Sequence, residues 1–309
     1  MRSSLTRPGA AIGALVTALT LAGCGIGLGP PAVRLVVTRE FGSRVLSRSG
    51  PLKAGSNETV LGLLQAHDAV VAGASPYFLQ SIAGVSAGSD GDRSLRWFAY
   101  VNGVAVAKRL AKTTVNPGDH VWWDLHETSV LEQVPAVVGS YPEPFLNGLG
   151  GKRLPVRIEC ASASGYACRT VISRLRALSV PAAVSAIGSG AAPETLRVMV
   201  APWSGLEGVL AEELERGPES SGVYARFSAG GKQLTLLDQE GSTTRTLTSG
   251  AGLVAALRAP EEAPVWVITG TDEAGMNRAA GALDEATLDD RFAVALGSSG
   301  ALPLPQVGP

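Results

Sequence analysis

Hydrophobic and polar positions divide the chain into two regions with different patterns. The first region contains one amphipathic segment, in which Val60, Leu63, Leu64 and His67 follow the i, i+3, i+4, i+7 spacing of a helix face. Its other apolar runs are strand-like, and they lie at 33–42, 43–55, 77–85, 95–106 and 119–127. One helix among several strands predicts a small α+β domain over residues 33–130, with the helix lying on a sheet.

In the second region, residues 154–297, strand-like and helical patterns alternate, which predicts a mixed α/β domain with an antiparallel excursion. The predicted strands are 154–160, 182–188, 195–203, 222–228, 232–240, 243–248 and 264–270, and the predicted helices are 167–179, 205–217, 251–259 and 271–284. Residues 131–153 are rich in Pro and Gly and are interpreted as a linker, and residues 298–309 as a disordered tail. The fold class is therefore α+β overall.

The N-terminus carries a targeting pattern. Two arginines precede a short apolar run that ends in Leu21-Ala22-Gly23-Cys24, which resembles a bacterial lipobox. The run is shorter than the ~20 residues that span a bilayer, so residues 1–23 are interpreted as a signal peptide. Lipidation of Cys24 would anchor the protein to membrane lipid on the extracytoplasmic face of the cell membrane. The tether, residues 24–32, reaches no more than about 30 Å, which keeps the first domain near the membrane.

Charge and composition narrow the classes of partner. The chain has 309 residues, 45% of them hydrophobic and 17% charged, with a formal net charge of −1. That balance gives no electrostatic attraction for phosphate backbones, so nucleic acid is not an expected partner. Beyond Cys24 there are only Cys160 and Cys168, and in an oxidising compartment a pair so close in sequence predicts a local disulfide.

The run 119–127 holds two histidines and two tryptophans. As a strand it would separate His120 from His126 by about 20 Å, too far for one metal ion, so these residues and Asp124 are interpreted as surface polar residues. Alternation places Trp123 in the core and Trp122 on the opposite, polar face.

An aromatic patch follows from that alternation. Phe98 and Tyr100 would share the outward face with Trp122 if their strands are neighbours, and Asn102 lies next to them. Two interpretations stay open: the patch binds a ligand or partner, or the second domain covers it as ordinary interface core.

The sequence gives little support for a catalytic site in the second domain. It has no histidine and no Gly-x-Ser-x-Gly motif, so we expect no catalytic residues, no metal, no cofactor and no enzymatic activity. A secondary binding candidate lies where loops follow predicted parallel strands, at Trp203, Ser204, Thr271 and Asp272. The alternative is that Thr271 or Asp272 caps a helix and Trp203 fills a gap in the core.

A set of short motifs in the first domain resembles a known family. Trp97, Tyr100 and Val101-Asn102-Gly103, followed by Pro117-Gly118-Asp119, occur in the order typical of the transcobalamin C-terminal-like family, also called DUF4430. The resemblance covers roughly residues 33–128 and implies a β-grasp-like fold and extracellular binding. Asn102-Gly103 suits a tight turn between two strands. In animal cobalamin carriers such a domain covers a corrinoid held by a helical domain, and no such helical domain is evident here.

Together these features predict a membrane-anchored extracytoplasmic binding lipoprotein that captures a small molecule, such as a vitamin or cofactor, near an uptake transporter. The alternative is a non-enzymatic envelope adaptor that binds another protein through the aromatic patch.

Overall fold

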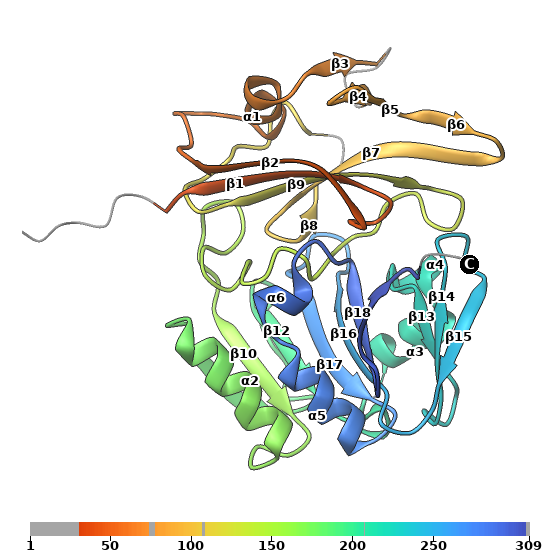
Figure 1. Ribbon diagram of the computed structural model, residues 1–309. Coiled ribbons are helices and arrows are strands. Elements are labelled where there is room, and N and C mark those ends of the chain that lie inside the picture. The colour runs from red at the N-terminus through yellow and green to blue at the C-terminus, as the bar shows by residue number, and fades with distance from the viewer. Residues whose placement is uncertain (1–30, 74–77, 107–108, 207, 307–309) are drawn as a thin grey trace, which may run out of the picture.

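The computed structural model describes residues 31–73, 78–106, 109–206 and 208–306. The predicted signal peptide, Cys24 and the tether up to residue 30 lie outside the described residues. Within them the protein is α+β, as predicted, with several sheets and short helices (Figure 1). No described helix is long and apolar enough to cross a membrane.

The first domain is a mixed sheet with a helix on one face. Its strand order is β2-β1-β9-β7-β6, with β8 paired to β7, and β1 and β9 run parallel in the centre while the other pairs are antiparallel. This is the topology expected of a β-grasp-like domain. The elements are β1 (Val33–Arg39), β2 (Arg44–Leu52), α1 (Val60–His67), β6 (Gly88–Asp90), β7 (Arg93–Val101), β8 (Val104–Ala105) and β9 (His120–Glu127).

The helix α1 and a small three-stranded sheet cover the face of this sheet that is turned away from the second domain (Figure 1). The small sheet comprises β3 (Val70–Ala72), β4 (Leu79–Ile82) and β5 (Val85–Ser86). Trp123 and Leu125 of β9 pack there with Leu63 and Leu64 of α1, so the prediction that Trp123 is core is confirmed. His67, the fourth residue of the predicted helix face, is exposed, because α1 ends at that residue.

The second domain is built on a seven-stranded sheet of order β11-β10-β12-β17-β16-β18-β19. The first four strands are parallel to one another, and β16, β18 and β19 join antiparallel. Its strands are β10 (Val156–Cys160), β11 (Ala182–Ala186), β12 (Leu196–Val200), β16 (Gly252–Leu257), β17 (Val265–Gly270), β18 (Ala293–Gly297) and β19 (Gly300–Leu304).

The helices α2 (Tyr166–Ala177), α5 (Glu273–Gly281) and α6 (Glu285–Leu288) cover one face of this sheet (Figure 1). A second sheet lies against the other face, together with α3 (Val209–Arg216) and α4 (Pro218–Ser221). A 3-10 turn lies at Trp203–Gly205. The second sheet comprises β13 (Ala225–Phe227), β14 (Leu234–Leu237) and β15 (Thr243–Leu247). Cys160 at the end of β10 forms the predicted disulfide with Cys168 of α2.

Three sequence predictions about elements and domain linkage are wrong. Residues 252–257 form the buried strand β16 and not a helix, because a short apolar run buried on both faces has the same pattern in either element. Residues 300–304 form the edge strand β19 and not a disordered tail, and a proline is tolerated there because an edge strand has one unpaired side.

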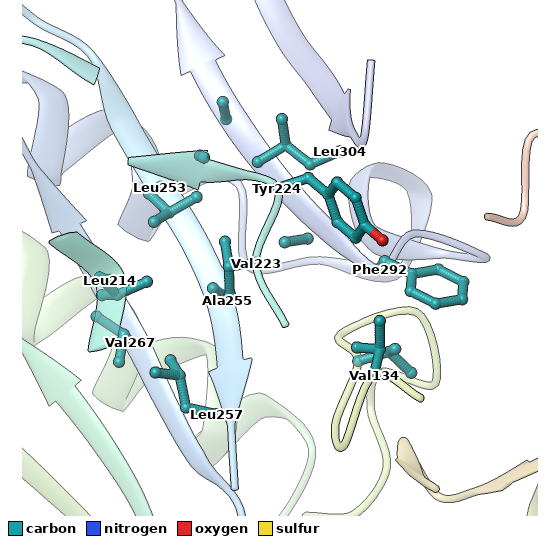
Figure 2. Close-up of a cluster of buried hydrophobic side chains, with 14 of the residues drawn as sticks. Val134, Leu214, Val223, Tyr224, Leu253, Ala255, Leu257, Val267, Phe292 and Leu304 are labelled. Atoms are coloured by element: carbon teal, nitrogen blue, oxygen red, sulfur yellow. The ribbon is translucent and has the colours of Figure 1, made fainter. Parts of the chain in front are cut away.

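The third error concerns residues 131–153. This segment is not a free linker, because Val134 and Val137 join the core between the two domains and Tyr141 and Phe145 join the core under α2 and α5. Figure 2 shows Val134 beside Tyr224 and Phe292 at one end of the shared core. The two domains are therefore joined by a continuous hydrophobic cluster.

Candidate functional site

The predicted aromatic patch exists, but the second domain covers it. Tyr100 and Trp122 are fully buried and Phe98 is nearly so. Phe292 of the second domain makes edge contacts with both, at ring-centroid distances of 5.6 Å to Tyr100 and 5.2 Å to Trp122. The patch is thus interface core and is not open to a ligand or partner, because leaving so much aromatic surface in water would be costly.

The polar residues on the same face of β9 are also buried, so their assignment to the surface is wrong. His120, Asp124 and His126 are each at most 1% exposed. His126 lies between the rings of Phe41 and Phe98, with both centroids at 4.5 Å. Among the described residues no group of His, Cys, Asp and Glu has the arrangement of a metal site.

Asp124 is the centre of a buried hydrogen-bond network. Its carboxylate accepts from the Thr38 hydroxyl (2.5 Å) and from the backbone N–H groups of Phe41 (3.1 Å) and Gly42 (2.9 Å), and it contacts Nδ1 of His126 at 2.8 Å. Thr38 in turn accepts from the Trp122 indole N–H at 2.7 Å. A buried carboxylate is tolerated because its oxygens are satisfied in this way.

Asn102, placed in the patch from the sequence, has a structural role. Its φ is 52° and that of Gly103 is 79°, so the predicted tight turn between β7 and β8 is confirmed. The Asn102 side chain is fully buried, where it donates to Asp119 (2.8 Å) and to the carbonyl of Gly148 (2.7 Å) and accepts from the N–H of His120 (2.8 Å). The Val-Asn-Gly and Pro-Gly-Asp motifs are therefore joined by the hydrogen bond between Asn102 and Asp119.

The secondary candidate residues are structural as well. Trp203 is buried and stacks on Phe227 with centroids 4.1 Å apart, so it fills a gap in the core. Asp272 caps α5 by accepting from the N–H of Gly275 (2.9 Å), which lowers the pKa of its carboxyl. The Thr271 hydroxyl donates to the carbonyl of Thr248, and Ser204 is exposed. These loops carry no ligand-binding arrangement.

A cavity at one end of the first sheet is a further candidate site. It has a volume of about 360 Å³ and lies where β1, β5, β6, β7 and β9 meet the turn between β14 and β15 of the second domain. Both domains therefore contribute to it. Its lining residues are Arg39, Glu40, Val85, Ser86, Ala87, Gly88, Ser89, Asp90, Arg93, Leu95, Leu125, His126 and Gln239.

Two arginines dominate the polar wall of this cavity. Arg39 ends β1 and Arg93 begins β7, and each side chain is 34% exposed. The nearest carboxylate oxygen to the Arg39 Nε belongs to Glu40 at 3.6 Å, and those nearest the Arg93 Nε belong to Glu127 (3.6 Å) and Glu240 (3.7 Å). These are ion pairs beyond hydrogen-bond distance.

The two arginines were not found from the sequence, because they are far apart in the chain and no motif surrounds them. Strand order places β1 and β7 on either side of β9, and Arg39 and Arg93 line the same cavity. In the register, Arg39 lies opposite Leu125 of β9, and Leu125 pairs with Trp97 of β7, four residues after Arg93. His126 was noted in the sequence, but as a surface residue.

These features define an α+β protein with a β-grasp-like domain packed on a mixed α/β domain. A family model, the domain of unknown function DUF4430, matches residues 57–127, which confirms the predicted resemblance to DUF4430 over that stretch. The match takes in α1, β7 and β9 together with the Val-Asn-Gly and Pro-Gly-Asp motifs. No curated protein matches the chain.

Proposed function

We propose that this protein is a membrane-anchored, extracytoplasmic binding protein that holds a small molecule in the cavity lined by Arg39, Arg93 and His126. The observation that carries the proposal is the cavity itself, because ligand sites lie preferentially at domain interfaces and its ~360 Å³ is at the lower end of the usual range for small-molecule sites. Anchoring rests on the lipobox-like sequence that ends in Cys24.

The packing between the domains supports a preformed site. Gly42, next to the cavity, packs against the backbone of Asp290 in the second domain so closely that no Cβ would fit there. Across the same interface Arg34 pairs with Glu285 (2.5 Å), and Arg48 pairs with Asp289 and Asp290. A site held by such an interface loses little conformational freedom when a ligand binds.

The adaptor alternative loses the surface on which it was based, because Phe98, Tyr100 and Trp122 lie inside the interface. Binding without catalysis remains the proposal, with delivery to an uptake transporter as its specific form. The short tether would keep the cavity near such a transporter in the membrane.

The proposal is tested by thermal-shift screening of the mature protein against anionic, neutral and cationic small molecules. A ligand at one hundred times its Kd should stabilise the protein by about 2.7 kcal/mol. Ser89→Trp, which fills the cavity, should abolish that stabilisation, whereas Ser204→Trp at an exposed position elsewhere should not. If no compound in a broad panel stabilises the protein, or if Ser89→Trp leaves every response intact, the proposal fails.

The anchor is tested separately in the native host or a bacterial surrogate. Wild-type protein should incorporate labelled palmitate and sediment with membranes, and Cys24→Ser should do neither. Incorporation of label into Cys24→Ser would contradict lipidation at this residue.

A further inference from the structure

The two cavity arginines have unused hydrogen-bonding capacity. Among the described residues neither Arg39 nor Arg93 donates a side-chain hydrogen bond to another group, and the Nε atom of each is buried without a partner. A guanidinium has several N–H donors in a fixed plane, and burying one without a partner is costly. Each side chain is 34% exposed, so its terminal N–H groups, and not the buried Nε, are the donors available to a ligand at the cavity wall.

We propose that the cavity recognises an anionic group, a carboxylate or a phosphate, between the guanidinium groups of Arg39 and Arg93. This rests on the proposed binding function and names its ligand class. Arginine suits the task because its planar fork binds both oxygens of a carboxylate or phosphate at once, and such charge-assisted hydrogen bonds are about twice as strong as neutral ones.

The acidic residues in the wall leave this arrangement intact. The Oε2 of Glu40 lies 3.0 Å from the Nε of Arg44, so this carboxylate is paired with Arg44. Asp90 lies at the exposed end of β6. The Oε1 of Glu127 accepts hydrogen bonds from the backbone N–H groups of Thr128 (3.1 Å) and Ser129 (2.8 Å), and its Oε2 lies 3.6 Å from the Arg93 Nε, beyond hydrogen-bond distance. None of them forms a hydrogen bond with either arginine.

His126 adds a polar group to the same wall. It is 1% exposed, its Nδ1 contacts Asp124, and its Nε2 has no hydrogen-bond partner among the described residues. A buried polar atom without a partner beside a cavity is a further sign that a ligand completes the site. Ser86 and Ser89, which also line the cavity, can donate hydrogen bonds from their hydroxyl groups to the remaining oxygens of the ligand.

Matched probes test the charge requirement in the intact mature protein. Benzoate and its neutral isostere benzamide differ only in the anionic group. Inorganic phosphate tests whether the site binds a phosphate as well as a carboxylate. Isothermal titration at low ionic strength should detect benzoate, phosphate or both, with benzamide at least tenfold weaker than benzoate wherever benzoate binds. Raising the salt concentration should weaken the binding of the anions.

Variants assign the binding to the two arginines. Arg39→Gln and Arg93→Gln should each weaken anion binding about tenfold or more, whereas Arg216→Gln on α3, outside the cavity, should not. Arg39→Lys and Arg93→Lys keep the charge but lose the planar fork, so they should bind with intermediate affinity. Circular dichroism confirms that each variant is folded.

Two results would overturn the inference, and they differ in what they mean for the function. In the first, neutral compounds bind as tightly as anions, lose their binding in Ser89→Trp and bind the arginine variants with unchanged affinity. In that case the cavity binds ligands but does not select anions. If neither the probes nor any panel compound binds, the proposed binding function fails together with this inference.

Discussion

Replacing Trp122 by alanine tests the packing of the two domains most directly. The side chain is fully buried in the shared core, and truncating a buried tryptophan costs about 3–5 kcal/mol. Its indole N–H also donates to Thr38 at 2.7 Å, a bond worth about 1 kcal/mol net. We therefore expect Trp122→Ala to lower the free energy of unfolding by about 4 kcal/mol and the Tm by about 10 °C.

Urea denaturation followed by far-UV circular dichroism gives this value without relying on tryptophan fluorescence. Trp122→Phe keeps an aromatic ring and should cost only about 1–2 kcal/mol. Tyr166→Ala, at a side chain that is 56% exposed, is the control and should stay within about 0.5 kcal/mol of wild type. A loss below about 1 kcal/mol for Trp122→Ala would refute the conclusion that the second domain covers this face.

The contact itself can be isolated by a double-mutant cycle with Phe292. The rings of Trp122 and Phe292 are 5.2 Å apart at 75°, an edge-to-face geometry. Such aromatic pairs contribute about 0.5–1.5 kcal/mol beyond area burial, so Trp122→Ala and Phe292→Ala should be non-additive by about that amount. Strict additivity would indicate that the two rings do not interact in solution.

Three further predictions follow from single buried residues. Asn102→Ala removes side-chain hydrogen bonds from a residue with φ of 52° and should cost about 2–4 kcal/mol in urea denaturation, whereas a cost under 0.5 kcal/mol would contradict its structural role. Burial lowers the pKa of His120 from 6.5 to about 3, so as the pH falls this histidine takes up a proton in the unfolded chain before it does so in the folded protein. Stability due to this group is thus present above pH 6.5 and is lost as the pH falls toward 3, by up to about 1.4 kcal/mol per pH unit. His120→Gln should make the pH dependence of unfolding shallower, and an unchanged slope would count against this origin. Leu304→Ala should cost about 2–4 kcal/mol if β19 is an ordered strand, but almost nothing if the C-terminus is a free tail.

Local patterns predicted the elements whose periodicity is regular. Val121, Trp123 and Leu125 recur with a period of two, so the division that places Trp123 with the helix and Trp122 on the opposite face could be derived from the sequence. The turn at Asn102-Gly103 was equally predictable, because few residue pairs tolerate positive φ at two consecutive positions. In both cases the physical cause acts within a few residues.

Predictions failed where the cause lies in distant parts of the chain. The segment 131–153 has the Pro and Gly content of a linker, yet Val137 and Phe145 are buried because the domains close over it. The sequence predicts His126 and Asp124 at the surface, because charge in a strand normally faces water and nothing near them in the sequence shows that a second domain covers that face. The arginine pair of the cavity had no local signal either.

The buried network and the cavity are connected through one turn. Glu40, Phe41 and Gly42 have φ values of 59°, 55° and 80°, a conformation that costs energy for the two residues with side chains. Consecutive residues of this kind direct their N–H groups to one point, and here the point is the carboxylate of Asp124. The buried charge thus stabilises a turn that would otherwise be unfavourable. Because Arg39 directly precedes that turn, the interior carboxylate fixes where a cavity arginine leaves the sheet. Asp124 does not line the cavity itself, but through this turn it positions the part of the wall that Arg39 and Glu40 form.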